Sequence, residues 1–441
     1  MPLMSSKLLN CIEVRCVDEE VGLGVFASSN IQKGSTIYCD TPLVSIQHTA
    51  NRRFVKACQC CHRSIGSVRE QFQTIFSEER FENIDLSVLP YSGSSAVYCA
   101  CGEVYCSPEC AARSFSEHHR FLCVSHCGLH SEAISNFKYY CLSIEGCGDN
   151  LLLLAQLLGV LSSNPSMLQE LLTYTTRPFN EVARPGFGQE RDVEWEKWLE
   201  CTISEAFTLL DKALSPQHVF FANFFANRVK AFQICSRLLS MFELNNIDIA
   251  IPSQLAARVR TMAPSPTLDK ILREKEVVMR ALWSDESRGV YDEPEYEEDD
   301  GVSDDLDEES EIESDTETMH DEQHDDNHVT AMLEELRSEI ANVPLSELLV
   351  ESSFPDFHGT GFFCSVARTN HSCVPNVTMD FTRETSTVVC TALDNIPVGV
   401  ELRMSYISNP GSKSTQVRRN QLIDYLFECQ CPLCIKQHHG I

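Results

Sequence analysis

The sequence is poor in positive charge. Its 441 residues include 35 lysines and arginines against 64 aspartates and glutamates, a formal net charge of −29. Residues 285–328 hold 22 of these acids and one basic residue, so this segment contributes −21 and the rest of the chain carries −8. Such a run repels itself, and we predict an acidic disordered loop over residues 284–328. The remainder shows no basic face for nucleic acid, so we expect no direct sequence-specific DNA binding.

Long hydrophobic runs and internal repeats are also missing. The longest apolar stretch, around Leu151–Leu161, is interrupted by Gln156 and is too short to span a bilayer. The N-terminus lacks the apolar segment of a signal peptide. We therefore expect a soluble, intracellular monomer of the nucleus, the cytoplasm or both, with no membrane partner. Apolar residues form 43% of the chain, which is enough for a full hydrophobic core.

Cysteine, in contrast, is abundant, with 22 in the chain. In a reducing compartment this indicates zinc sites or buried thiols, not disulfides. Residues 54–127 contain eight spaced candidate ligands, seven cysteines and one histidine, the number that two tetrahedral zinc ions need. In an interleaved arrangement one ion would be bound by Cys58, Cys61, Cys106 and Cys110. The other would be bound by Cys99, Cys101, His119 and Cys123. Cys60 and His118 are alternative ligands, above all for Cys99, and unrelated buried thiols are the other interpretation.

The pattern of apolar residues changes along the chain. Residues 12–48 alternate β-branched with polar residues between glycine turns, which predicts strands. Residues 131–283 place apolar side chains three and four apart, which is typical of helices, and residues 329–351 resemble them. Residues 357–406 return to short strands. We expect one split β domain that carries a long helical insert.

Three motifs follow one another in the last 75 or so residues. Residues 368–376 form a polar segment with Asn370, His371 and Cys373 in close succession. Residues 401–406 read as a strand that ends at a tyrosine, and an aromatic residue then precedes a C-x-C-x2-C knuckle. The knuckle offers three thiolates, one fewer than a structural zinc ion needs.

This order, with the cysteine-rich module upstream, resembles the SET and MYND domain family of protein-lysine methyltransferases over most of the chain. The resemblance implies an α+β fold. Its parts would be a split, pseudo-knotted SET β-fold, an inserted MYND zinc finger, a helical SET insertion and a post-SET zinc knuckle. The implied ranges are 1–53 for the N-terminal SET part, 54–127 for the MYND-type finger, 128–283 for the helical linker and SET insertion, 284–328 for the acidic loop, 329–410 for the C-terminal SET part and 411–441 for the knuckle.

The resemblance also assigns site residues. Tyr406 would be catalytic, because its hydroxyl could orient the amine of the substrate lysine. S-adenosylmethionine would be bound by Gly22, Gly24, Asn370, His371, Tyr406 and Phe427, with Asn245 as a looser match for which Asn246 competes. Cys373 would complete a third zinc site with Cys429, Cys431 and Cys434. The family usually has a lysine or arginine where Glu20 and Val21 stand in this chain.

The implied activity is transfer of a methyl group to lysine in histone or non-histone proteins, for example ribosomal ones. The expected partners are a protein substrate with a basic lysine-containing segment and, through the MYND module, proline-rich peptides. The acidic run would then attract basic substrates. The alternative is a catalytically weak zinc-binding adaptor that uses the MYND module for protein interaction, and the Glu20-Val21 position is its best support.

Overall fold

The computed structural model of the protein describes residues 11–18, 21–77, 84–90, 96–144, 146–175, 177–185, 191–286, 322–382 and 384–438. Glu20 and residues 287–321 of the predicted acidic loop lie outside the described residues. At both ends of that run the chain is helical, since one helix continues to Glu286 and the next begins at Glu322.

The strands form three small sheets and one hairpin. Their orders are β1-β2-β12-β9, β10-β11-β3, β4-β8-β7 and β5-β6. The N-terminal strands β2, β3 and β4 pair antiparallel with the distant strands β12, β11 and β8, as predicted for a split β domain. The bounds are β1 Ile12–Asp18, β2 Gly22–Ala27, β3 Thr36–Asp40, β4 Val44–Gln47, β5 Val97–Tyr98, β6 Val104–Tyr105, β7 Asn246–Ile251, β8 Phe357–Phe362, β9 Asn370–His371, β10 Val377–Phe381, β11 Val388–Ala392 and β12 Glu401–Met404.

The helices fill the long middle of the chain and its end. Capping side chains explain where two of the helices begin. Ser67 and Glu70 form a capping box at the start of α2. Asp192 accepts a hydrogen bond from Trp195 N at 2.7 Å at the start of α9. The bounds are α1 Thr49–Arg52, α2 Val68–Ile75, α3 Pro108–Ser114, α4 Arg120–Leu122, α5 Ser131–Leu142, α6 Gly148–Ser163, α7 Met167–Leu171, α8 Phe179–Val182, α9 Val193–Leu214, α10 Val219–Phe225, α11 Arg228–Asn245, α12 Gln254–Arg260, α13 Pro266–Glu286, α14 Glu322–Ile340, α15 Leu345–Leu348, α16 Thr415–Leu422 and α17 Pro432–His438.

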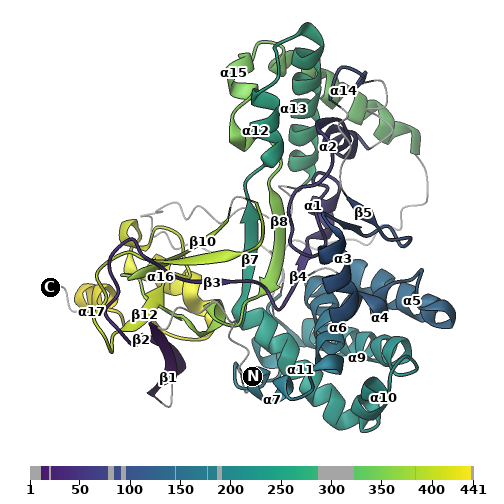
Figure 1. The fold of residues 1–441 in the computed structure, drawn as a ribbon. Coiled ribbons are helices and arrows are strands. Elements are labelled where there is room, and N and C mark those ends of the chain that lie inside the picture. Colours follow the sequence, from purple (N-terminus) through teal and green to yellow (C-terminus); the bar gives the residue numbers. More distant parts are fainter. Residues whose placement is uncertain are drawn as a thin grey trace, which may run out of the picture.

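Strand β7 corrects the prediction of helix over residues 131–283. Its isoleucines at 247, 249 and 251 alternate with polar or small residues, a period of two that suits a strand. β7 and β8 are antiparallel neighbours although residues 252–356 lie between them. That insert includes α12, α13, α14 and α15, which form an arm at the top of the molecule (Figure 1).

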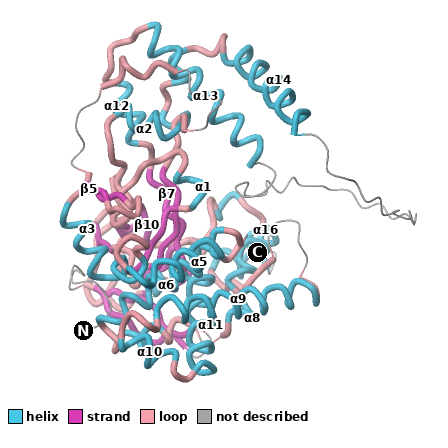
Figure 2. Tube along the Cα trace, turned by 90° about the vertical axis from the view of Figure 1, so that its right-hand side faces the viewer, coloured by secondary structure: helices cyan, strands magenta, loops and turns pink. Residues whose placement is uncertain are grey.

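Two large hydrophobic cores hold most of the described residues together, and two smaller clusters form around the cysteines. The first joins the strands to α2 and the arm, and Phe72, Ile249 and Leu272 are among its buried side chains. The second lies among α5, α6, α9, α10 and α11, which gather at the end opposite the arm (Figure 2). Val44 and Phe362 of the β4–β8 pair are buried in this second core, so the sheet and the helices are packed as one body. No helix in the described part of the chain is long and apolar enough to cross a membrane.

Candidate active site and metal centres

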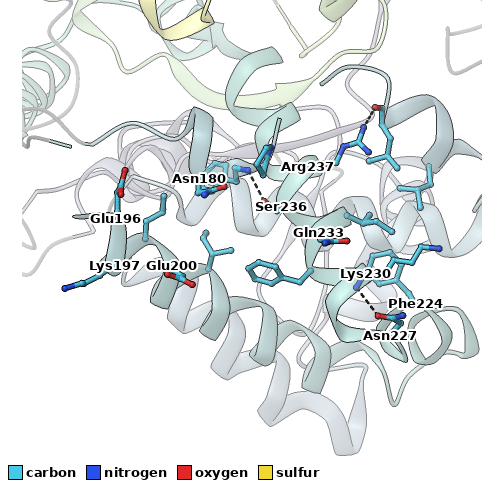
Figure 3. A pocket seen from close by; sticks show the side chains of 18 of the residues that line it. Asn180, Glu196, Lys197, Glu200, Phe224, Asn227, Lys230, Gln233, Ser236 and Arg237 are labelled. Atoms are coloured by element: carbon cyan, nitrogen blue, oxygen red, sulfur yellow. Dashed lines mark hydrogen bonds between the residues drawn. The ribbon is translucent and has the colours of Figure 1, made fainter. Parts of the chain in front are cut away.

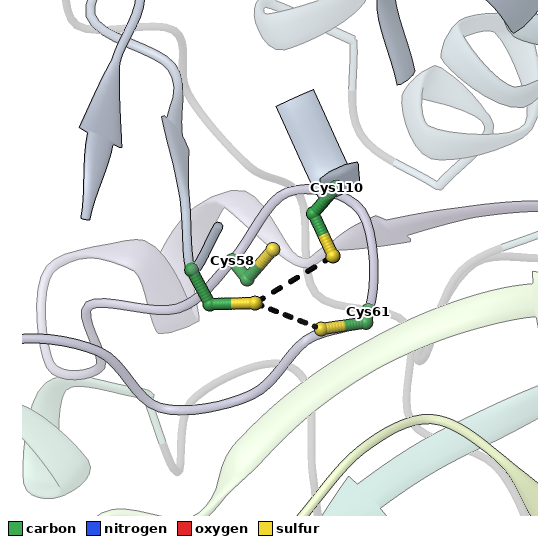
Figure 4. Close-up of side chains that lie close together, drawn as sticks. Cys58, Cys61 and Cys110 are labelled. Atoms are coloured by element: carbon green, nitrogen blue, oxygen red, sulfur yellow. Dashed lines mark hydrogen bonds between the residues drawn. The ribbon is translucent and has the colours of Figure 1, made fainter. Parts of the chain in front are cut away.

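Cys58, Cys61, Cys106 and Cys110 form the first cysteine cluster (Figure 4). Their sulfur atoms all lie within 4.8 Å of one another, with 3.6 Å from Cys61 to Cys106 and 3.5 Å from Cys106 to Cys110. Ser107 caps α3 by accepting from Cys110 N, which places the last thiol. A hydrogen bond from the Cys61 thiol lowers the pKa of Cys58 to about 5, so a thiolate is favoured here.

The second cluster interleaves with the first along the chain. Cys99 Sγ lies 3.5 Å from Cys123 Sγ and 3.4 Å from His119 Nε2, and Cys101 Sγ lies 3.5 Å from the same nitrogen. The alternative ligands are used elsewhere. Cys60 Sγ accepts from Arg113 Nε at 3.0 Å, and His118 packs so closely on Gly159 that a Cβ there would come within 2.7 Å.

The third cluster ties the C-terminal tail to the loop after Asn370. Cys373 Sγ lies 3.8 Å from Cys429 Sγ and 3.7 Å from Cys434 Sγ, and Cys431 completes the set. All four thiols are buried. Burial raises the pKa of Cys431, but hydrogen bonds from the backbone of Cys434 and Cys373 outweigh it and bring the pKa to about 7.

The three clusters fit zinc in geometry and chemistry. Four thiolates at the Zn–S distance of about 2.3 Å in a tetrahedron are separated by about 3.8 Å. The sulfur–sulfur distances given above, 3.5–3.8 Å, match this edge. Soft sulfur ligands with imidazole select zinc over magnesium or calcium. The structure therefore groups the ligands as the cysteine spacing and, for Cys373, the family resemblance predict.

Asn370 lies where the two halves of the β domain meet. β9 runs parallel to β12, with Asn370 opposite Arg403. Asn370 Nδ2 donates to Glu401 Oε1 at 2.8 Å and to the Leu23 carbonyl of β2 at 3.3 Å. The other carboxylate oxygen of Glu401 pairs with Arg403 at 2.6 Å. One side chain of β12 thus fixes the orientation of the Asn370 amide.

Glycine is required at the two positions of β2 for different reasons. Gly22 has a φ of +80°, which favours glycine. A Cβ on Gly24 would lie 2.7 Å from Glu401 Oε1 and 3.0 Å from Asn370 Nδ2. Gly24 is therefore needed for packing against the Asn370–Glu401 pair, a reason that the sequence did not reveal.

His371 connects the candidate catalytic tyrosine to the third cluster. Tyr406 N donates to His371 Nδ1 at 2.9 Å, so the ring proton is on Nε2, which lies 3.3 Å from Cys373 Sγ. Burial and the nearby cations Arg403 and Arg418 lower the pKa of His371 to about 4, which keeps the ring neutral. A histidine that is neutral and donates to a thiolate stabilises a metal ligand from the outer shell.

Tyr406 is surrounded by aromatic rings. Its hydroxyl donates to the Thr369 carbonyl at 2.9 Å, and burial raises its pKa, so it is protonated at neutral pH. The Tyr406 ring centroid lies 4.9 Å from that of Tyr425 and 6.2 Å from that of Phe427. Phe427 keeps 40% of its surface exposed. Sequence reasoning missed Tyr425, although it stands two residues before Phe427.

The two neighbouring asparagines at the end of α11 differ. Asn245 Nδ2 donates to the Met241 carbonyl of its own helix at 3.0 Å. Asn246 Nδ2 donates to Asn150 Oδ1 at 3.1 Å, and within the described chain its buried Oδ1 has no hydrogen-bond partner. The orphaned oxygen makes Asn246 the better candidate to bind a ligand, and the role of Asn245 stays a prediction.

Comparisons with known proteins agree on one family. The SET domain model matches residues 192–407. The chain is 21% identical over 441 residues to the protein-lysine N-trimethyltransferase SMYD5 of Mus musculus, covering 97% of this chain and 87% of that protein. It is 32% identical over 120 residues to SMYD5 of Homo sapiens, which covers 25% of this chain and 27% of that protein.

A plant relative supports the same assignment over a shorter stretch. The histone-lysine N-methyltransferase ASHR1 of Arabidopsis thaliana is 41% identical over 76 residues, 17% of this chain and 15% of that protein. The alignments, the split β domain and the motif order agree, and the resemblance inferred from the sequence is confirmed. The chain belongs to the SET and MYND domain family of protein-lysine methyltransferases.

Proposed function

We propose that this protein transfers a methyl group from S-adenosylmethionine to the side-chain amine of a lysine in a protein substrate. The observation that carries the proposal is the surroundings of Tyr406. Its protonated hydroxyl is held by the Thr369 carbonyl among the rings of His371, Tyr425 and Phe427.

The donor would be held by residues that come from both halves of the β domain. Asn370 offers a fixed amide, Phe427 offers a half-exposed ring for stacking on a flat heterocycle, and Asn246 offers an orphaned buried oxygen. Gly22 and His371 would complete the wall. When bound, S-adenosylmethionine supplies a methyl group on a positively charged sulfur. A polar and aromatic set of this kind fits such a ligand better than it fits a phosphate, which would require basic residues.

For this reaction the residues of the site must keep the amine of the substrate lysine neutral and must orient it. A free lysine has a pKa of about 10.4, so its neutral form at pH 7 lies about 4.6 kcal/mol higher in free energy. A dry site walled by Tyr406 and Tyr425 disfavours the ammonium and so lowers this pKa. The Tyr406 hydroxyl donates its proton to the Thr369 carbonyl, so its oxygen could accept a hydrogen bond from the amine of the substrate lysine. This bond would point the nitrogen lone pair toward the methyl group. Positioning of this kind contributes up to roughly 7–11 kcal/mol.

The three clusters would hold structural zinc. Each has four protein ligands, which leaves no open position for catalysis. A structural zinc ion contributes roughly 10–16 kcal/mol of apparent binding free energy, so residues 54–127 and the tail would depend on metal to fold. Arg418, which is fully buried, donates to Cys434 Sγ at 3.5 Å and offsets the charge of the thiolates there.

Residues 54–127 would be a MYND module that binds proline-rich peptides, and the helices between the β segments would be the SET insertion. The tail, clipped to Cys373, would pass through a loop in the pseudo-knotted manner. A basic segment of a histone or ribosomal protein would be the substrate. The protein would act as a monomer in the nucleus or cytoplasm.

Calorimetric titration with S-adenosylmethionine tests the proposal against a zinc-binding adaptor. The zinc-loaded wild-type protein should bind the donor, and Asn370→Ala should weaken binding at least tenfold because the amide is lost. Gln416→Ala, at a solvent-facing position of α16, is the matched control and should bind normally. A well-folded, zinc-loaded wild type that shows no heat of binding would favour the adaptor.

A further inference from the structure

We propose that a cavity beside the candidate active site binds a lysine or arginine side chain of the protein substrate, next to the lysine that is methylated. This inference rests on the proposed function and names part of its substrate specificity. The cavity has a volume of about 830 Å³ and lies between α5, the residues after α8, the first turns of α9 and the end of α11.

The walls combine aromatic rings with acidic groups. The rings are Tyr140, Phe179, Trp195 and Trp198, and the acids are Asp192, Glu194 and Glu243, against a single base, Arg184. Such a wall would bind a cationic side chain through two interactions, a cation–π contact with the rings and an ion pair with the carboxylates. The Arg191 guanidinium lies 5.5 Å from the Trp195 ring centroid, which shows that this ring can pack against a cation, although Arg191 itself lines the neighbouring, larger cavity.

The three carboxylates are not equally available. Asp192 is occupied as the cap of α9, and Glu243 accepts from Asn150 Nδ2 at 2.9 Å. Among the residues that the structure describes, Glu194 makes no hydrogen bond or ion pair through its side chain. Trp198 stands one turn further on and is 43% exposed, with its ring centroid 6.5 Å from that of Trp195. Glu194 and Trp198 are therefore the groups that an incoming cation would meet.

Two series of contacts connect the cavity to the residues proposed for the active site. Arg184 Nε lies 3.3 Å from Asp424 Oδ1, and Asp424 directly precedes Tyr425, whose ring packs on Tyr406. On the other side, Glu243 is joined through Asn150 to Asn246. A substrate whose lysine lies among these rings would have its flanking residues close to the cavity.

The opposite face of α9 has a different character. A larger cavity of about 1220 Å³ separates α9 from α11, with Glu196, Lys197 and Glu200 on one side and Lys230 and Gln233 on the other (Figure 3). Four bases line it against two acids, so it does not favour a cation. Glu200 on this face provides a control of the same helix and the same charge.

The test uses the full-length, zinc-loaded protein and peptides that contain one central lysine. A single arginine is placed in turn at each flanking position, and in a matched set it is replaced by neutral citrulline. At the favoured position we expect wild type to have a KM about fivefold lower for arginine than for citrulline, with equal kcat. Glu194→Gln and Trp198→Ala should abolish the difference, and Glu200→Gln should keep it.

Failure of the inference and failure of the proposed function are distinguishable. Equal KM values for arginine and citrulline at every position would overturn the inference while methyl transfer itself stands. If no peptide is methylated, the proposed function loses support, and fluorescence then decides about the cavity, because two of the three tryptophans of the chain line it. Quenching that needs arginine and is weakened by Glu194→Gln supports the cation site. Equal quenching by both peptide sets contradicts it.

Discussion

Glu401 Oε1 accepts a hydrogen bond from Asn370 Nδ2 at 2.8 Å, and this contact joins the strand that precedes Tyr406 to the loop that would bind the methyl donor. Glu401 is nearly buried, with a side-chain exposure of 9%, and its charge is balanced by Arg403. A buried, charge-assisted bond of this kind contributes about 1.5–3 kcal/mol. The geometry of Asn370 therefore depends on a residue that need not touch the donor.

Glu401→Gln should keep the fold but weaken donor binding. Glutamine retains the shape and one acceptor, but it loses the ion pair with Arg403 and leaves the Asn370 amide less firmly held. We expect the Kd for S-adenosylmethionine to rise about tenfold, measured by calorimetry, with an unchanged circular dichroism spectrum. Glu384→Gln, whose exposed ion pair with Arg63 lies outside the site, is the control. An unaltered Kd for Glu401→Gln would remove the positioning role.

Gly24→Ala should damage the same contact by steric means. The new Cβ would lie 2.8 Å from Val17 Cγ2 as well as close to Glu401 and Asn370, so β2 and β12 would have to separate. We expect a loss of about 1–3 kcal/mol in the free energy of unfolding and weaker donor binding. Gly411→Ala, where nothing lies within 4 Å of the added carbon, should change the unfolding free energy by less than about 0.5 kcal/mol. Equal stability of the two variants would show that the close approach at Gly24 is relaxed in solution.

Cys373→Ser should remove one of the three zinc ions. The serine hydroxyl is a poor substitute for the thiolate. The zinc ion of this cluster would then have only three ligands, Cys429, Cys431 and Cys434. Elemental analysis should give two zinc ions per chain, and the tail around Phe427 should become sensitive to protease. Cys201→Ser, at an exposed cysteine outside the three clusters, should retain full zinc content. Three bound zinc ions in Cys373→Ser would contradict the assignment of the third cluster.

Lys275 should make stability depend on pH. Its side chain is fully buried, with the ammonium 4.3 Å from the Phe354 ring centroid and 3.3 Å from Glu276, and burial lowers its pKa from 10.5 to about 8. Between these values the unfolded chain binds the proton more tightly, so the folded state gains stability as pH rises. Relative to Lys275→Met, wild type should gain about 2 kcal/mol between about pH 7.5 and 9.5. Denaturant unfolding of both proteins measures this, since the titration of other groups cancels, and parallel pH curves would show that Lys275 keeps an ordinary pKa.

The ligand sets could be predicted from the sequence because coordination is local. Pairs such as Cys58 and Cys61 lie close along the chain, and four-ligand sites leave few ways to divide eight ligands. The fourth ligand of the knuckle, Cys373, came from the family resemblance and not from spacing. The strands at both ends of the chain were also predictable, since their alternation of side chains is a property of short segments.

The rest depends on contacts between distant segments. The place of Glu401 beside Gly24, the ring of Tyr425 on Tyr406, and the orphaned oxygen of Asn246 all arise from packing that periodicity does not encode. β7 was missed because its six residues follow a long helix without a break. The acid-lined cavity likewise joins residues from α5, α9 and α11 that no motif connects.

Methyl transfer by wild type and by Tyr406→Phe is the most direct test of the whole account. The substitution removes one hydroxyl, which donates to Thr369 and would orient the amine, and leaves the ring to pack on Tyr425. With S-adenosylmethionine carrying a labelled methyl group and a cell extract as acceptor, wild type should label lysine in protein. Tyr406→Phe should lose most of that labelling, at least about a hundredfold, while its zinc content and thermal stability remain close to wild type. Labelling that is undiminished in Tyr406→Phe, or absent with wild type that binds the donor, would contradict the account.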